Sequence, residues 1–431
     1  MAEQLNTGMQ ADVLVVGGGP AGIGAAIAAA RAGADTLLLE RYGFFGGVAA
    51  YGCGMPINQM RPAGVPRGAI HEAIIARLLD YGDDAVRVSD HALVCNVEYL
   101  KVAVMDALHE AGCRFRLHSR VVGAHVADGR ITSVALATKT GTVEIEAGAV
   151  VDATGDADVA AYAGAATLKG RETDGFLSPM TLNMIITNVD VPAARGFQQA
   201  GGLRRLLEEA RDRYPLLPES MGLERRPFPI DNALVINHSG TKLHGVLDGT
   251  LIADLTTAEA YSRRQALQIV AALREYGGPA FARVQLAATG PQVGVRETRR
   301  VKGLTILTED DAMAGRRCDD AIAWRSGMLD IGFTRYEPMQ VHDVPYRALV
   351  PETLDGLLAA GRCISATHVA ASAGKSMGNC VATGHAAGWA AAMSVARGCR
   401  PRELDVAALQ AALRADGVDL AWTPPDSYKA I

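Results

Sequence analysis

A glycine-rich segment near the N-terminus constrains the fold of this chain more than any other feature. Residues 13–16 are apolar and mainly β-branched, which is typical of a buried parallel strand. A cluster of glycines follows, and the alanine-rich residues 21–31 predict a helix. Residues 36–39 predict a second buried strand. This order of strand, glycine turn, helix and strand predicts a βαβ unit at the start of the chain.

The glycines and one acidic residue of this segment have the spacing that a dinucleotide requires. Gly17 permits a tight turn, Gly19 lets the backbone approach a phosphate, and Gly22 lets the helix pack close to the strand. Pro20 suits the first helical turn, where its missing N–H costs nothing. Glu40 follows the second strand, where a carboxylate accepts hydrogen bonds from a ribose. We therefore predict that the helix N-terminus binds the diphosphate of a dinucleotide.

The composition limits the classes of protein and partner. The chain has 431 residues, of which 49% are hydrophobic, and this length allows two closely packed domains. The net charge of −5 and the lack of a basic excess argue against a nucleic acid or an anionic membrane as partner. The apolar stretch at about 384–395 is short for a membrane span, and the polar first ten residues lack the apolar core of a signal peptide. We expect a cytoplasmic protein.

The cysteines show no ligand pattern. The seven of them are scattered and none forms a CxxC pair. This distribution predicts reduced thiols rather than a disulfide frame, and it predicts no metal site.

Further along the chain, the pattern predicts a domain interrupted by an insertion. Helices are expected at 68–81, 97–110, 203–213 and 256–276, with Asn96 as the N-cap of the second and a capping box at 255–259 for the last. Strands are expected at 114–118, 121–126, 131–137, 142–145, 149–152, 180–189 and 357–360. A hairpin turn is expected at Asp128-Gly129. We expect the strands at 149–152 and 357–360 to join the N-terminal βαβ unit in one sheet. The fold class is therefore α/β: a Rossmann-like domain with a parallel sheet (1–164 and 341–400), an inserted mixed α+β substrate domain (165–340) and a C-terminal tail (401–431).

Two features favour FAD over NAD as the dinucleotide. The chain has one GxGxxG segment, so a second nucleotide-binding fold is not expected. A helix that begins near Ser376 would direct its positive end at the edge of a flavin and would stabilise the reduced form. The pattern of this helix fits a purely structural, alanine-rich packing helix equally well.

Five stretches together resemble a known family. They are Gly17 to Glu40, Gly43-Phe-Phe-Gly46-Gly47, Asp152-Ala-Thr-Gly155-Asp156, residues 294–303, and Gly361 to His368 with Gly384 to Gly388. In combination they are similar to the FAD-dependent oxidoreductases of the glutathione-reductase-like superfamily, related to fumarate-reductase-type flavoproteins. The sequence departs from the common pattern at Lys375, where relatives often carry Arg, and at 329–332, where many carry a His, so the substrate class does not follow from the resemblance.

The resemblance implies a set of FAD contacts. They are Gly17, Gly19, Pro20, Ala21, Gly22, Glu40, Arg41, Gly46, Gly47, Val122 (or its neighbour Val121), Ala153, Thr154, Gly155, Gly361, Arg362, Ser376, Met377, Gly378 and Asn379.

Candidate catalytic residues are fewer, and each has a structural alternative. His368 is the candidate base, although a single buried His is more often structural. Cys53 lies in a glycine-dense loop near the expected flavin, where such a Cys is more often a small apolar filler. Arg299 belongs to the cationic run at 296–302, which either binds an anion or is a solvated strand edge. The candidate substrate contacts are Tyr51, Arg61, Arg296 and Tyr346.

The sequence thus predicts an FAD-dependent oxidoreductase, a dehydrogenase or oxidase, that moves a hydride between a small organic substrate and the flavin. Its electron acceptor is unknown and a homo-oligomer is possible. One alternative is a flavin monooxygenase that uses NAD(P)H. The other is a non-catalytic or tRNA-modification flavoprotein, against which the acidic net charge argues.

Overall fold

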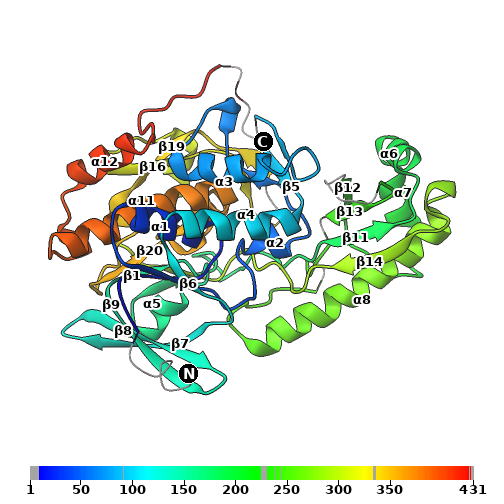
Figure 1. The fold of residues 1–431 in the computed structure, drawn as a ribbon. Coiled ribbons are helices and arrows are strands. Elements are labelled where there is room, and N and C mark those ends of the chain that lie inside the picture. Colours follow the sequence, from blue (N-terminus) through cyan, green and yellow to red (C-terminus); the bar gives the residue numbers. More distant parts are fainter. Residues whose placement is uncertain are drawn as a thin grey trace.

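A seven-stranded sheet forms the centre of the protein (Figure 1). The structure is a computed structural model that describes residues 9–90, 92–224, 231–237, 239–242, 244–332, 336–426 and 428. The strands follow the order β6-β2-β1-β9-β8-β7, with β20 paired to β9. Their bounds are β1 Met9–Val16, β2 Thr36–Leu39, β6 Arg114–Arg116, β7 Arg120–Ala127, β8 Arg130–Thr138, β9 Gly141–Asp152 and β20 Leu357–Ala359. β6, β2, β1, β9 and β20 run parallel, whereas β8 and β7 are antiparallel additions.

The predicted joining of distant strands is confirmed, with one correction. β1 pairs with both β2 and β9, and β20 pairs with Val150 to Asp152 of β9. The two strands predicted at 142–145 and 149–152 are one strand, β9, because Glu146 and Ala147 continue the pairing with β1. The hairpin at Asp128-Gly129 is confirmed, with left-handed φ values of 50° and 72°.

Two helices lie against each other on the sheet at unusually short separation. They are α1 (Pro20–Arg31) and α11 (Met377–Ala396), drawn in blue and orange in Figure 1. A Cβ on Gly384 would lie 1.9 Å from the Ala21 carbonyl oxygen, and one on Gly388 would lie 2.1 Å from that of Ala25. The glycine and alanine content of both segments therefore serves close helix–helix packing, which brings the start of α11 beside the start of α1.

Further elements complete this part of the molecule. The helices are α2 (Val48–Tyr51), α3 (Ala69–Leu79), α4 (Val97–Glu110), α5 (Asp158–Tyr162), α9 (Glu309–Ala314), α10 (His368–Gly374) and α12 (Val406–Ala415). Small sheets are formed by β3 (Ile57–Asn58), β5 (Ala92–Cys95) and β4 (Val86–Val88), by β10 (Thr167–Lys169) with β15 (Arg299–Val301), by β16 (Ala321–Arg325) with β19 (His342–Pro345), and by β17 (Met328–Asp330) with β18 (Tyr336–Pro338). Asn96 caps α4 as predicted, since its side chain accepts from the Glu98 amide.

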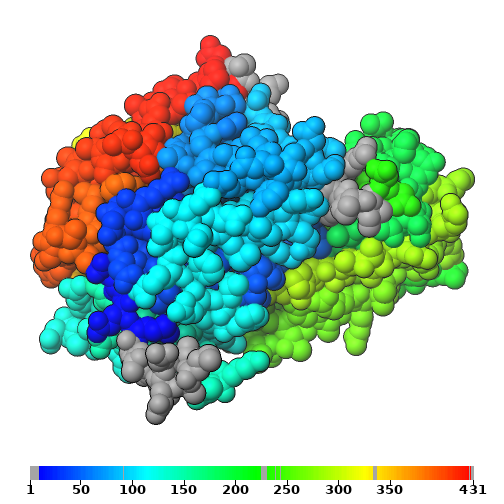
Figure 2. Space-filling model, in the orientation of Figure 1, coloured from blue at the N-terminus to red at the C-terminus, as the bar shows by residue number. Residues whose placement is uncertain are grey.

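A second lobe extends from the central part, at the right of Figures 1 and 2. It contains an antiparallel sheet in the order β12 (Gly222–Glu224), β13 (Leu234–Asn237), β11 (Met184–Thr187) and β14 (Gln285–Thr289), with helices α6 (Val191–Gln199), α7 (Gly202–Glu209) and α8 (Ile252–Tyr276). Its own hydrophobic core is formed by residues between 184 and 284, whereas Val301, Ile322 and Val344 join the main core. The molecule is thus an α/β protein with an additional mixed lobe. The domain boundaries at 165 and 340 stay a prediction.

The capping box predicted at 255–259 is wrong. α8 begins at Ile252, so the threonines of that segment lie inside the helix. The hydroxyls of Thr256 and Thr257 donate to the carbonyls of Ile252 and Ala253, four residues earlier. Among the described residues no helix is long and apolar enough to cross a membrane.

Candidate active site

A large cavity opens where β1, β2, β9 and β20 end. Val16, Leu39, Ala153 and Ala360, at or just past these strand ends, line it. The carboxyl edge of a parallel sheet is the usual place for a ligand in such folds. The cavity has two halves. The sheet half is lined by Gly17, Gly19, Pro20, Ala21, Glu40, Arg41, Gly47, Ser119, Val121, Thr154, Gly155, Asp156 and Arg362, and the α11 half by Tyr51, Met55, Asn58, Thr181, Gln292, Arg296, Asp330, Lys375, Ser376, Met377 and Cys380.

The sheet half begins with the glycine turn between β1 and α1. Gly17 has a left-handed φ of 102°, and a Cβ there would lie 2.6 Å from the Ala153 carbonyl oxygen. A Cβ on Gly22 would lie 1.7 Å from the carbonyl oxygen of Gly17. A Cβ on Gly19, in contrast, would have only the Cα atom of Gly47 within 4 Å. The open side of Gly19 therefore faces the cavity. α1 has no side-chain cap, which leaves backbone N–H groups of its first turn available to an anion in the cavity.

Glu40 lies buried at the end of β2. Its carboxylate accepts from the Gly18 amide at 2.7 Å and from the Tyr42 amide at 2.8 Å, one bond to each oxygen. Burial raises the pKa of Glu40, and the bonds from the two amides act in the opposite direction. Each carboxylate oxygen has two lone pairs, so Glu40 still has acceptor capacity toward the cavity that it lines.

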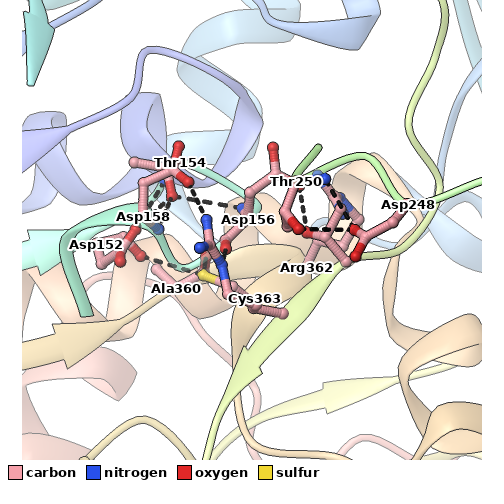
Figure 3. A network of polar contacts seen from close by, with 11 residues as sticks. Asp152, Thr154, Asp156, Asp158, Asp248, Thr250, Ala360, Arg362 and Cys363 are labelled. Carbon is pink, nitrogen blue, oxygen red and sulfur yellow. Dashed lines mark hydrogen bonds and ion pairs between the residues drawn. The ribbon is translucent and has the colours of Figure 1, made fainter. Parts of the chain in front are cut away.

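A polar network holds the turn after β9 (Figure 3). Asp152 is fully buried and accepts from the Thr154 amide, the Thr154 hydroxyl and the Ala160 amide. Asp156 accepts from Arg362 at 2.6 Å, and this bond ties the turn to the segment after β20. The network therefore fixes one wall of the cavity with groups from two distant parts of the sequence.

The α11 half carries a compact cluster of charges. Asp330 accepts from Arg296 and lies 3.2 Å from the Lys375 ammonium, whose nitrogen also donates to the Asp330 backbone carbonyl. Burial, and next the Arg296 charge, lower the pKa of Lys375 to about 7. Burial opposes ionisation of Asp330, but Arg296 and Lys375 hold its pKa below the usual range. A lysine with such a pKa exchanges protons readily near neutral pH.

The start of α11 completes this half. Ser376 and Met377 line the cavity, and no side chain caps the helix. Behind them Asn379 accepts from the buried Arg67 at 2.8 Å and donates to the Ser326 carbonyl. The helix therefore presents its positive N-terminus beside Lys375.

The comparison with protein families shows which class of protein this chain belongs to. Residues 12–413 match the model of the family described as FAD dependent oxidoreductase, which is most of the chain. This chain belongs to the FAD-dependent oxidoreductase family. It is an enzyme, and its cofactor is FAD.

Individual relatives of this FAD-dependent oxidoreductase are distant. Digeranylgeranylglycerophospholipid reductase 2 from Methanopyrus kandleri is 33% identical over 151 residues, which cover 34% of this chain and 38% of the reductase. BexE, described in terms of oxidation during BE-7585A biosynthesis, is 16% identical with a TM-score of 0.50 over 90% of this chain and 63% of its own. A geranylgeranyl bacteriochlorophyll reductase-like protein from Thermoplasma acidophilum is 14% identical with a TM-score of 0.47 over 91% of this chain and 80% of its own. The likeness to BexE supports the fold alone.

The residues of the cavity fit FAD in their chemistry. The open side of Gly19 and the uncapped start of α1 suit a diphosphate, and Glu40 suits a ribose. Arg362 adds a buried guanidinium whose Nη1 has no partner in the described structure. A second uncapped helix start, that of α11, lies in the same cavity.

The structure brings most of the predicted site residues of this oxidoreductase together. Those that line the cavity are Gly17, Gly19, Pro20, Ala21, Glu40, Arg41, Gly47, Ala153, Thr154, Gly155, Arg362, Ser376, Met377, Tyr51 and Arg296. Five more do not line the cavity, but each is a chain neighbour of a residue that does: Gly22, Gly46, Gly361, Gly378 and Asn379. Val122 points to solvent and is 40% exposed, and its neighbour Val121 lines the cavity instead.

Five predicted catalytic or substrate residues do not line this cavity. Arg61 pairs with Glu72, and the Tyr346 phenol donates to the Pro401 carbonyl in the core. Arg299 donates to the backbone carbonyl of Asp156 and pairs with Asp158, so it supports the wall of the cavity from behind.

The other two are buried outside the lining. Cys53 is a buried thiol, and burial raises its pKa to about 11, which leaves it protonated and unreactive at neutral pH. His368 is fully buried behind the cavity and hydrogen-bonds to Glu297 at 2.8 Å.

The sequence reasoning missed Lys375 and Asp330 as a site. In the sequence both stand out only as departures from the family pattern, at 375 and at 329–332. Their proximity depends on the fold, because 45 residues separate them in the chain. The two departures are the signal that the sequence offers, and they do not show that the two residues meet.

Proposed function

We propose that FAD lies along the cavity with its diphosphate at Gly19 and the start of α1, its adenosine ribose at Glu40 and its adenine beside Val121. Arg41 and Arg362 offset the charge of the diphosphate, and the flavin ring system lies in the α11 half, near Ser376 and Met377. The arrangement of the lining residues supports this placement.

We further propose that the enzyme is a dehydrogenase or oxidase that exchanges a hydride with a small organic substrate in the α11 half. FAD, when bound, supplies the two-electron chemistry. Lys375 accepts or gives the accompanying proton at its Nζ atom, and Asp330 holds the ammonium in place. Arg296 keeps the proton affinity of Lys375 low, and the walls at Tyr51 and Met55 exclude water. The observation that carries this proposal is the Lys375–Asp330–Arg296 cluster at the uncapped start of α11.

Two finer points stay predictions of the sequence. One is the cytoplasmic location and the other is the homo-oligomeric state. The electron acceptor is unknown.

An anaerobic substrate screen tests the proposal. The FAD-loaded protein is mixed with a panel of alcohols, amines and hydroxy acids, and the flavin absorbance is followed. A dehydrogenase or oxidase loses absorbance with one class of donor, and a subsequent oxygen-consumption assay separates the two. Lys375→Met is the matched control, and it should keep bound FAD while losing the reduction.

A flavin monooxygenase is the second candidate. It is the alternative that the sequence left open, and it is compatible with the fold that the chain shares with BexE, a protein described in terms of oxidation. Rapid anaerobic loss of flavin absorbance with NADH or NADPH, and none with the donor panel, would replace the first proposal by this one.

A further inference from the structure

A second, very small cavity lies directly behind the active site. Arg296, Arg362 and Lys375 line both cavities, so the two share a wall. The small cavity is further lined by Ser178, Glu297, Thr298, Arg300, His368 and Ser372. Its volume of about 10 Å³ is the space of a single water molecule.

Two buried side-chain atoms on the wall of this small cavity have opposite hydrogen-bonding needs. His368 Nε2 and Arg362 Nη1 are both buried without a partner in the described structure. His368 Nδ1 lies 2.8 Å from a carboxylate oxygen of Glu297, so Nδ1 carries the proton and Nε2 of the neutral ring is an acceptor. Arg362 Nη1 can only donate. A water that accepts from Arg362 and donates to His368 satisfies both atoms, and buried polar atoms are rarely left unsatisfied.

Lys375 lies on the wall that divides the two cavities. The ionisable groups around it are Arg296 and Glu297 from the segment before β15, Arg300 of β15, Asp330 of β17, Arg325 of β16 behind Gly374, Arg362 after β20, and His368 of α10. Of these groups, His368 alone carries an imidazole, the side chain that serves most often as a general acid or base. It is therefore the group best suited to exchange a proton with Lys375.

We propose that a water in the small cavity connects Lys375 to His368, and that the buried pair His368–Glu297 is the proton reservoir of the active site. When Lys375 gives a proton to the substrate, the water passes one proton to the amine and takes the Nε2 proton of the imidazolium, which leaves neutral His368. In substrate oxidation the same protons move in the reverse order. In neither direction does an electron or any other group move through the relay. His368 is thus a positioning and relay residue that acts through Lys375, and this inference rests on the proposed function.

The test compares His368→Gln with Ser372→Ala, which alters the same cavity wall but removes no titrating group. The seven lysines of the chain allow the ε-carbon of Lys375 to be followed by ¹³C NMR in labelled, substrate-free protein, with Lys375→Arg to assign its signal. In His368→Gln we expect the titration midpoint of Lys375 to move by about half a pH unit or more, because coupled groups titrate as a pair. In Ser372→Ala we expect no shift.

Flavin reduction by substrate gives the second readout. We expect His368→Gln to lower its rate about 10-fold to 100-fold and to change the pH profile, with FAD content unchanged. An unmoved Lys375 midpoint together with an unchanged pH profile in His368→Gln would overturn the relay. If Lys375→Met also leaves the reduction intact, the proposed function fails as well, so the two failures are distinguishable.

A crystal structure of the wild-type holoenzyme keeps the inference testable should His368→Gln not fold. We expect an electron-density peak for one water between His368 Nε2 and Arg362 Nη1. An empty cavity would contradict the relay.

Discussion

The two halves of the active-site cavity are built on different principles. The sheet half relies mainly on backbone: a glycine turn, an uncapped helix start and a carboxylate whose conformation is fixed by local amides. Its main elements lie within residues 17–47 of one continuous segment. The α11 half is made of side chains from residues 296, 330 and 375, which only the complete fold brings together.

This difference separates the part of the function that FAD enzymes share from the part that is specific to this protein. In the proposed function the backbone half binds a diphosphate and a ribose, which are the same in every FAD enzyme. The side-chain half sets the proton affinity of one lysine through burial and neighbouring charges, and this property can change with a single substitution. Changes in the two halves should therefore have separable effects on cofactor content and on turnover.

The largest expected effect is on turnover, from Lys375→Met. Removal of the proton-exchanging group should lower the rate of flavin reduction by about 10²–10⁴-fold, a usual range for general acid–base groups. FAD content should stay near that of the wild type, because the sheet half is untouched. Stopped-flow absorbance under anaerobic conditions measures both quantities. A rate within threefold of the wild type (~0.7 kcal/mol in the barrier) would remove Lys375 from the mechanism.

The next effect is on stability and cofactor content, from Gly22→Ala. The new Cβ would lie 1.7 Å from the Gly17 carbonyl oxygen, so the turn and α1 must separate. We expect a loss of about 3 kcal/mol in the free energy of unfolding and a loss of bound FAD. Denaturant unfolding and the absorbance ratio of flavin to protein give the two values.

Gly196→Ala is the matched control for that change. Gly196 also lies in a helix, α6, but nothing lies within 4 Å of an added Cβ. The variant should be more stable than the wild type by up to about 1 kcal/mol and should keep its FAD. Equal destabilisation by the two substitutions would contradict the role given to Gly22.

These contrasts also explain how much the sequence alone could predict. The strand at 13–16, the helix that begins at Pro20 and the proposed role of Glu40 depend on local spacing, and the predicted cofactor half follows from them. The continuity of β9 and the early start of α8 were missed, because pairing with β1 and packing in the second lobe override the local pattern. The Lys375–Asp330 pair was missed because proximity in space has no counterpart in spacing along the chain.

A smaller effect on cofactor affinity is expected from Glu40→Gln. The amide keeps the shape of the side chain but has one acceptor oxygen in place of two, so one of the Gly18 and Tyr42 amides loses its partner. We expect an FAD affinity about 10-fold weaker, or ~1.4 kcal/mol, with an unchanged rate of reduction once FAD is saturating. Fluorescence titration of the apoprotein with FAD measures the affinity. An unchanged affinity would show that Glu40 has no part in the cofactor half.

The smallest effect is expected from Arg61→Ala. Arg61 pairs with Glu72 outside the cavity lining, and the pair is partly exposed to solvent. We expect at most about 1 kcal/mol of lost stability, and no change in FAD content or in the KM of the substrate found in the screen. A raised KM would return Arg61 to the substrate contacts that the sequence predicted.

The central claim is that Lys375 titrates in the α11 half and carries the proton of the reaction. Its most direct test is the pH dependence of flavin reduction by the substrate, measured in a single turnover for the wild type and for Lys375→Arg. Substrate oxidation needs the neutral amine, so the wild-type rate should rise with pH through a midpoint near 7, where the lowered pKa of Lys375 lies. Arginine stays charged throughout, so this rise should be absent from the variant. The same midpoint in both proteins would contradict the claim.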